Sequence, residues 1–115
     1  MKRIILGALC CTLLGTALPT LARDLTPPEK KVIMDVVNDQ LKDPESAKYH
    51  WQADQGGEIY CAHVNSKNSY GGYAGKTPIL MDVERDARGR INSAQGGILS
   101  DSLSDHICTD AGYKI

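Results

Sequence analysis

The chain lacks the concentrated positive charge that nucleic acids and anionic lipid surfaces bind. It has 13 basic and 14 acidic residues, and two of the basic ones fall within residues 1–22. The densest basic group, Arg85, Arg88 and Arg90, stands among acidic neighbours. We interpret these arginines as a solvated turn. The charge pattern argues against nucleic acid or an anionic membrane as the main partner.

Recognisable catalytic and metal-binding motifs are also missing. No serine lies in a GxSxG elbow, and His50, His63 and His106 are scattered without an HExxH spacing. Zinc sites need three or four ligands in a compact set. We therefore expect no metal, no cofactor and no catalytic residue. A small cell-envelope hydrolase remains the alternative, because a pair of carboxylates, or Ser69 with His63 and an acid such as Asp82, need converge only in space.

The chain has no apolar run long enough to span a bilayer, which takes about 20 residues. Its one apolar run follows two positive residues at the N-terminus and is interrupted by Pro19. Small residues then lead to Ala22. This order predicts a secretory signal peptide over residues 1–22, cleaved before Arg23, and a periplasmic or secreted protein with no membrane span after processing.

Lipidation is the competing interpretation of this segment, because Cys10 and Cys11 lie in the apolar run. A lipid-modified cysteine normally follows a small residue, whereas Leu9 precedes Cys10, so cleavage without lipidation is favoured. Residues 23–115 would then form one small domain.

Two cysteines, Cys61 and Cys108, remain in that domain. An even pair in a small exported domain predicts a disulfide. A catalytic thiol or a metal ligand is the competing reading, but an exposed free thiol is rarely kept reduced in an oxidising compartment.

The spacing of apolar residues predicts an α+β domain. Thr26, Pro27 and Glu29 form a capping-box sequence, which predicts a helix from there to Leu41. Alternating patterns predict strands over 49–52, 58–65 and 78–85 and a weaker edge strand over 90–95, with turns at 54–57 and 86–89. A break is expected at Gly96 and Gly97. A short C-terminal helix follows, with an apolar face of Leu99, Leu103, Ile107 and Ala111 and with Gly112 after its end. We expect an N-terminal helix, a three- to four-stranded antiparallel sheet and a C-terminal helix joined by one disulfide.

The segment between the second and third predicted strands is the best candidate for binding. It is rich in glycine and holds two tyrosines, which offer amphipathic contact area, together with polar side chains that form hydrogen bonds. The candidate binding residues are Asn65, Lys67, Asn68, Ser69, Tyr70 and Tyr73. The alternative is an ordinary long turn whose tyrosines fold back over the core.

Two stretches resemble motifs of a family of small exported proteins of Gram-negative bacteria. Residues 41–49 read LKDPESAKY, similar to its LKDPxSA motif with a following aromatic residue. Residues 61–75 read CAHVNSKNSYGGYAG, similar to its CGxVNxKNSxGGYxG motif, with Ala62 where the family more often has glycine. The resemblance implies a signal peptide or lipid anchor and a small α+β domain. It brings no established activity, so no catalytic residue is carried over.

The sequence thus favours an exported binding or interaction protein, of an inhibitor or immunity type by analogy, whose partner is another envelope or secreted protein. The hydrolase and a purely structural envelope component are the alternatives. The sequence does not predict an oligomeric state.

Overall fold

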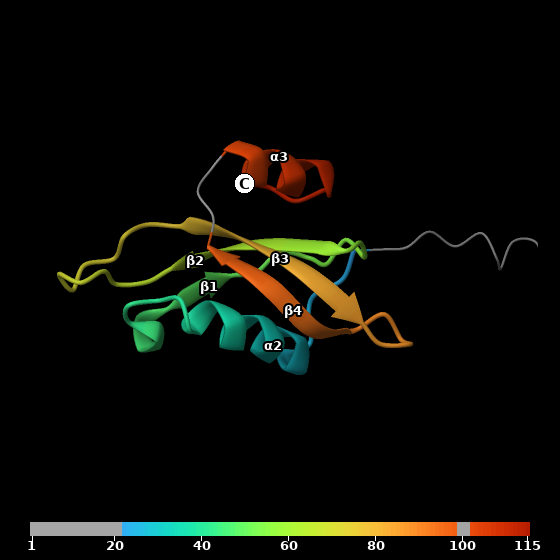
Figure 1. Ribbon diagram of the computed structural model, residues 1–115, viewed down its shortest axis with the longest axis horizontal. Coiled ribbons are helices and arrows are strands. Elements are labelled where there is room, and N and C mark those ends of the chain that lie inside the picture. The colour runs from blue at the N-terminus through green and yellow to red at the C-terminus, as the bar shows by residue number, and fades with distance from the viewer. Residues whose placement is uncertain (1–21, 99–101) are drawn as a thin grey trace, which may run out of the picture.

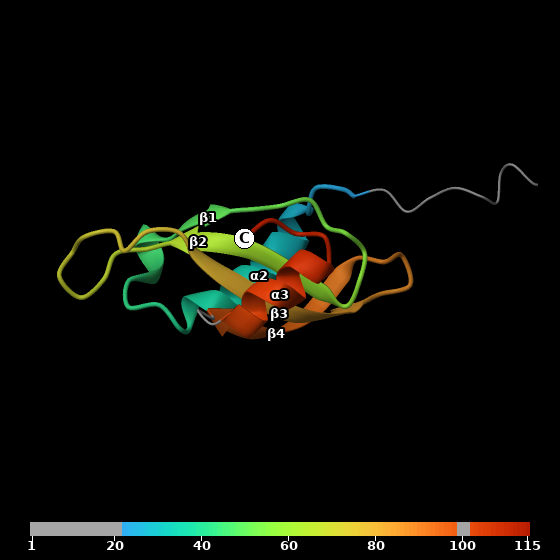
Figure 2. The same ribbon diagram turned by 90° about the horizontal axis from the view of Figure 1, so that it is seen from above.

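A computed structural model describes residues 22–98 and 102–115 and shows an antiparallel sheet with one helix on each face (Figure 1). The turned view places α3 over the strands, with α2 beneath them (Figure 2). The strands lie in the order β1-β2-β3-β4. This confirms the α+β prediction with four strands. The predicted signal peptide (apart from Ala22) and the helix-face residue Leu99 lie outside the described residues. The elements are α2 (Pro27–Asn38), η1 (Pro44–Ser46), β1 (Lys48–His50), β2 (Ile59–Asn65), β3 (Thr77–Arg85), β4 (Ile91–Ile98) and α3 (Ser102–Asp110).

Helix α2 begins as its sequence predicts, with Thr26 as N-cap and Glu29 completing the capping box. It ends at Asn38, three residues before the expected end at Leu41. In the turn that follows, the side-chain amide of Gln40 donates to the carbonyl oxygen of Gly96 at 2.8 Å and accepts from the N–H of Ile98 at 3.2 Å. The side chain of Gln40 therefore pairs with backbone groups on the edge of β4 that no neighbouring strand covers.

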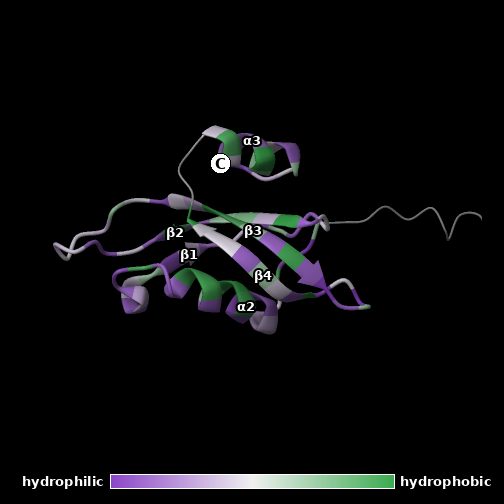
Figure 3. Cartoon of the chain, viewed as in Figure 1, coloured by the Kyte–Doolittle hydropathy of each residue, from purple (hydrophilic) through white to green (hydrophobic). Residues whose placement is uncertain are grey.

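The main core lies between α2 and the sheet. Ile33 and Val37 are fully buried, as the helical spacing predicts. Ala62, Ile79 and Met81 are also fully buried and alternate with residues that point to the other face of the sheet. Figure 3 shows apolar residues along α2 and the strands.

Strand β4 runs through Gly96 and Gly97, where the sequence predicted a break. Both glycines have positive φ, at 136° and 156°. A Cβ at Gly96 would overlap the carbonyl oxygen of Leu80 on β3, and one at Gly97 would overlap the amide of Gln40. These glycines therefore allow close approach within the sheet and do not end the strand.

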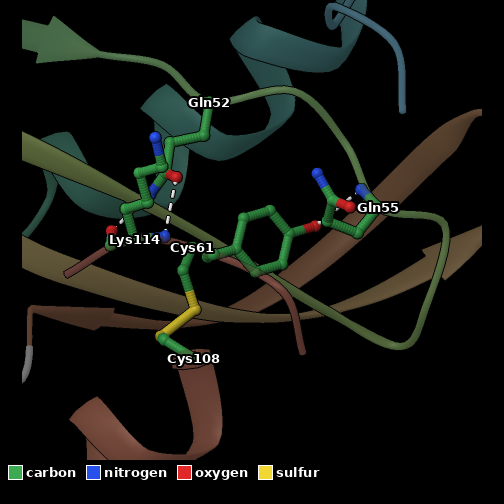
Figure 4. The surroundings of a disulfide bond; sticks show 6 residues. Gln52, Gln55, Cys61, Cys108 and Lys114 are labelled. Atoms are coloured by element: carbon green, nitrogen blue, oxygen red, sulfur yellow. Dashed lines mark hydrogen bonds between the residues drawn. A yellow bond between two sulfur atoms is a disulfide. The ribbon is translucent and has the colours of Figure 1, made fainter. Parts of the chain in front are cut away.

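The disulfide between Cys61 and Cys108 is confirmed, with a Cα–Cα distance of 5.9 Å, and it joins β2 to α3 (Figure 4). The predicted apolar face of α3 is buried only in part. Ser104 and Cys108 are buried and Ala111, just after the helix, packs against the core, whereas Leu103 is 66% exposed and Ile107 is 37% exposed. Because Cys108 must face Cys61, the covalent bond and not the apolar spacing sets the rotation of this helix. Gly112 follows the helix with φ of 98°, as predicted.

None of the helices within residues 22–98 and 102–115 has the length and apolar content that a bilayer crossing requires.

Replacing both bonded cysteines by alanine is expected to lower the free energy of unfolding by about 4 kcal/mol, because the bond joins positions 47 residues apart. Denaturant unfolding of wild type and of Cys61→Ala/Cys108→Ala measures the loss. Amide exchange should rise first in α3, which buries little besides its cysteine. Reductant should bring wild type to the stability of the variant and leave the variant unchanged. Equal midpoints for the oxidised protein and the variant would contradict the prediction.

Candidate functional site

The candidate binding loop, residues 66–76, joins β2 to β3 and extends beyond the end of the sheet (Figures 1 and 2). It lies at the opposite end of β3 from the tight turn that leads into β4. The sheet therefore presents this loop clear of both helices.

The loop is held in shape by its own hydrogen bonds. The Oδ1 atom of Asn68 accepts from the N–H groups of Tyr70 at 2.9 Å and Gly72 at 3.3 Å. Backbone bonds also link Asn68 and Gly72 in the other direction, at 2.8 Å. At the base of the loop, Oδ1 of Asn65 accepts from the N–H of Gly75 at 3.0 Å. The side-chain oxygens of Asn65 and Asn68, two of the predicted binding residues, thus stabilise the conformation of the loop.

Tyr73 fastens the loop to the segment before β1. Its hydroxyl donates to the carbonyl oxygen of Ser46 at 3.1 Å. The Nζ atoms of Lys48 and Lys67 lie 4.6 and 5.7 Å from its ring centre, within the range of cation–π attraction. The hydroxyl of Ser46 in turn accepts from the backbone N–H of Lys67 at 2.9 Å. Tyr73 is 43% exposed and contacts this segment, whereas the alternative interpretation had placed it over the core.

Tyr70, in contrast to Tyr73, extends into solvent. Its side chain is 96% exposed at the tip of the loop. Within the described part of the chain it makes no side-chain hydrogen bond and no ring contact, and the neighbouring Ser69 is exposed as well. The loop therefore separates residues that fix its conformation from a tyrosine that is free to contact another molecule.

The positive charge near this loop has no acidic counterpart within it. Lys67 and Lys76 lie in the loop itself, and Lys48 lies beside Tyr73. Residues 66–76 contain no aspartate or glutamate. The loop thus forms a small positive surface on a domain whose overall balance is acidic.

The residues considered for hydrolysis are not brought together. His63 pairs across strands with His50 and Pro78, whereas Asp82 pairs with Ile59, four residues along β2. Ser69 lies out in the loop. Burial lowers the pKa of His63, and the charges of Lys76 and His50 lower it further. The hydrolase stays an alternative without an assembled set of groups to support it.

The sequence reading missed a buried ion-pair network at the other end of the sheet. Arg23 donates through both terminal nitrogens to the Glu29 carboxylate, each at 2.8 Å. Arg85 does the same to Asp54, at 2.7 and 2.8 Å, and Arg23 also lies 3.1 Å from Asp54. The side chains of Glu29 and Asp54 are only 2% and 1% exposed. We call these four residues the ion-pair network.

Both carboxylates of the network are stabilised in their charged form. The hydrogen bonds from Arg23 hold the pKa of Glu29 far below its usual range, against the opposing effect of burial. The N–H groups of Thr26 and Ile91 contribute further. Burial would raise the pKa of Asp54, but hydrogen bonds from Arg85 and Gly56 outweigh it, and the net pKa is lowered.

Sequence signals for this network were partial. The capping box correctly marked Glu29 as an N-terminal helix residue but did not show that it is buried. Asp54 was predicted as a turn residue, and its carboxylate does accept from the N–H of Gly56 in that bend, at 2.9 Å, but its burial was not predicted. The prediction of Arg85 as a solvated arginine is wrong, because its side chain is only 17% exposed. Nothing in the local pattern showed that Asp54 and Arg85 form a pair, because they lie 31 positions apart in the chain.

Within the two described ranges, no group of three or more His, Cys, Asp or Glu side chains is arranged to hold a metal ion. No protein-family model, curated protein or solved structure matches the chain.

The Glu29→Gln variant is expected to lose about 3 kcal/mol of stability near neutral pH, at the lower end for a broken buried pair because Arg23 is partly exposed. The folded-state pKa of Glu29 is lowered, so its contribution is present above the ordinary pKa of about 4.5 and declines as the pH falls below it. Wild-type stability should thus fall with acidification more steeply than that of the variant. Denaturant unfolding between pH 7 and about pH 2 tests this.

The matched control is Glu58→Gln, which removes an exposed glutamate with no described side-chain partner. It should change stability by less than about 0.5 kcal/mol. A Glu29→Gln protein as stable as this control at every pH would contradict the assigned network.

Proposed function

We propose that the chain is an exported protein-binding module that inserts its 66–76 loop into a cleft of another envelope or secreted protein. The observation that carries the proposal is the 96% exposure of Tyr70 on a loop that is already ordered by Asn65, Asn68 and Tyr73. No catalytic role is part of the proposal.

The hydrogen bonds within the loop lower the free-energy cost of ordering it when it binds a partner. Ordering a loose loop costs free energy when it binds, and a pre-ordered loop avoids most of that cost. A tyrosine adds large contact area and a hydroxyl with few rotatable bonds. Tyrosines at the centre of interfaces often dominate affinity. Tyr70 is therefore the expected anchor, with Ser69 and Lys67 contacting the rim of the partner's cleft.

The positive charge of the loop favours a partner with an acidic surface. The lysine ammonium groups at positions 48, 67 and 76 favour a cleft lined with carboxylates, which speeds encounter and disfavours basic partners. A protruding loop of this kind suits a blocking role, as in an inhibitor or immunity protein. The disulfide supports export to an oxidising compartment, the periplasm or the exterior.

Truncating Tyr70 is expected to weaken capture of the partner by about thirtyfold, the effect of losing a hot-spot residue of about 2 kcal/mol. Immobilised wild type and Tyr70→Ala are compared for proteins retained from a periplasmic extract of the native host, and the dissociation constant is measured for any protein that wild type enriches. The control is Leu103→Ala, which removes a similarly exposed apolar side chain from α3. Stability should be unchanged in both variants. Identical retention by wild type and Tyr70→Ala would count against the loop.

Loosening the loop while leaving Tyr70 in place tests pre-ordering separately. Asn68→Ala removes the oxygen that accepts from Tyr70 and Gly72. We expect faster amide exchange at those two positions and an affinity about tenfold lower than that of wild type. Ser69→Ala, which removes no described hydrogen bond of the loop, is the control and should keep its exchange rates. Unchanged exchange in Asn68→Ala would show that the loop does not depend on this side chain.

A further inference from the structure

A separate surface pocket of about 350 Å³ lies at the end of the sheet away from the loop. Its walls come from the first turns of α2, the tight turn between β3 and β4, and the start of β4. This volume falls within the range of small-molecule sites. The residues that line it combine cations with an apolar lining.

Both carboxylates that line this pocket accept hydrogen bonds from other groups of the chain. Both oxygens of Glu29 accept hydrogen bonds from Arg23, and they also accept from the N–H groups of Thr26 and Ile91. Oδ1 of Asp86 accepts from the N–H groups of Arg88 and Arg90, at 2.8 and 3.0 Å. Glu29 is thus fully paired, whereas Asp86 keeps its second oxygen and interacts with the side chains of Arg88 and Arg90 through charge alone.

The guanidinium groups of Arg88 and Arg90 interact with the charge of Asp86 but form no close pair with it. Both side chains line the pocket, and neither makes a hydrogen bond or ion pair within the described residues. Each carries several donors in a planar fork that matches the two oxygens of a carboxylate.

The turn that carries these two arginines is firmly placed. The carbonyl oxygen of Gly89 accepts from Arg23 at 3.2 Å and from Arg85 at 2.9 Å. Gly89 has φ of 82°, a conformation suited to glycine. The ion-pair network thus fixes the backbone between Arg88 and Arg90, so two cations are presented on a rigid turn.

The pocket also has an apolar lining. Pro28 and Val32 of α2 contribute to it, together with Ile91 of β4, of which only 3% is exposed. A ligand that fits must offer an anion to the arginines and a short aliphatic group to this lining. The N-terminus of α2 does not supply the anion site, because prolines occupy its first two positions and Glu29 already caps it.

We propose that this pocket binds a carboxylate that carries a short branched aliphatic group, with Arg88 and Arg90 holding the carboxylate and Pro28 and Val32 contacting the aliphatic part. Two sources offer this chemistry: the C-terminus of a peptide and a free branched-chain acid. The site is independent of the loop that contacts the protein partner.

The test uses the purified protein with its disulfide intact and three probes: acetyl-alanyl-leucine, its C-terminal amide, and isocaproate. Amide NMR spectra are recorded during titration of each. We expect the free-acid peptide to shift the signals of Val32, Ile91 and Asn92 in a saturable way, and the uncharged amide to bind at least about tenfold more weakly. Binding should weaken as salt is added, since the arginines are exposed. If isocaproate binds as tightly as the peptide, a free branched-chain acid is sufficient as the ligand. If only the peptide binds, the ligand is the C-terminus of a peptide.

The decisive variant is Arg88→Gln/Arg90→Gln, which should weaken binding of the free-acid peptide at least about tenfold while leaving the thermal midpoint near that of wild type. The control, Lys42→Gln/Lys114→Gln, removes two cations outside the pocket and should bind as wild type does. Equal affinity for the acid and the amide, unchanged binding by the arginine variant, or no binding of either acid would overturn the proposal. Tyr70→Ala should bind all three probes normally, which separates this result from the fate of the loop.

Discussion

The ion-pair network is the constraint on which one whole end of the molecule depends. It joins the residue before α2, the first turn of α2, the segment before β2 and the end of β3, four parts of the chain that share no local pattern. Two carboxylates without arginines at these buried positions would be strongly destabilising. Paired and hydrogen-bonded as they are, they fix where α2 begins on the sheet and where the β3–β4 turn lies.

The other end of the sheet is organised by hydrogen bonds and cation–π contacts. Asparagine oxygens, a tyrosine hydroxyl and nearby lysines shape the loop between β2 and β3 without any acidic residue in the loop. The two ends therefore have different physical characters: one is held by buried charge, the other by hydrogen bonds to exposed backbone. The disulfide stands between them and holds α3 on a face to which the helix contributes little apolar contact.

Local patterns predicted most of the fold. The capping box placed the start of α2, alternation placed the strands to within two or three residues at each end, and two remaining cysteines had one possible pairing. The pattern was less informative where a long-range partner decides the outcome. Gly96 and Gly97 look like a break in sequence, yet they lie in β4, where the carbonyl oxygen of Leu80 and the side-chain amide of Gln40 occupy the space that a Cβ would need. The predicted apolar face of α3 is buried only in part because a covalent bond turned Cys108 toward the sheet.

The candidate loop shows the same contrast between what local patterns predict and what long-range contacts decide. Its composition alone indicated a binding loop, and the sequence by itself determined the elements, their order, the single disulfide and the residue types in that loop. Only the tertiary structure decided which of its residues build the loop and which are left free: Tyr73 is fastened by Ser46, 27 positions away, and Tyr70 is not. It alone also revealed Asp54 and Arg85 as a buried pair. The physical reason is that burial and pairing are properties of segments brought together by folding, whereas periodicity and capping are properties of neighbours along the chain.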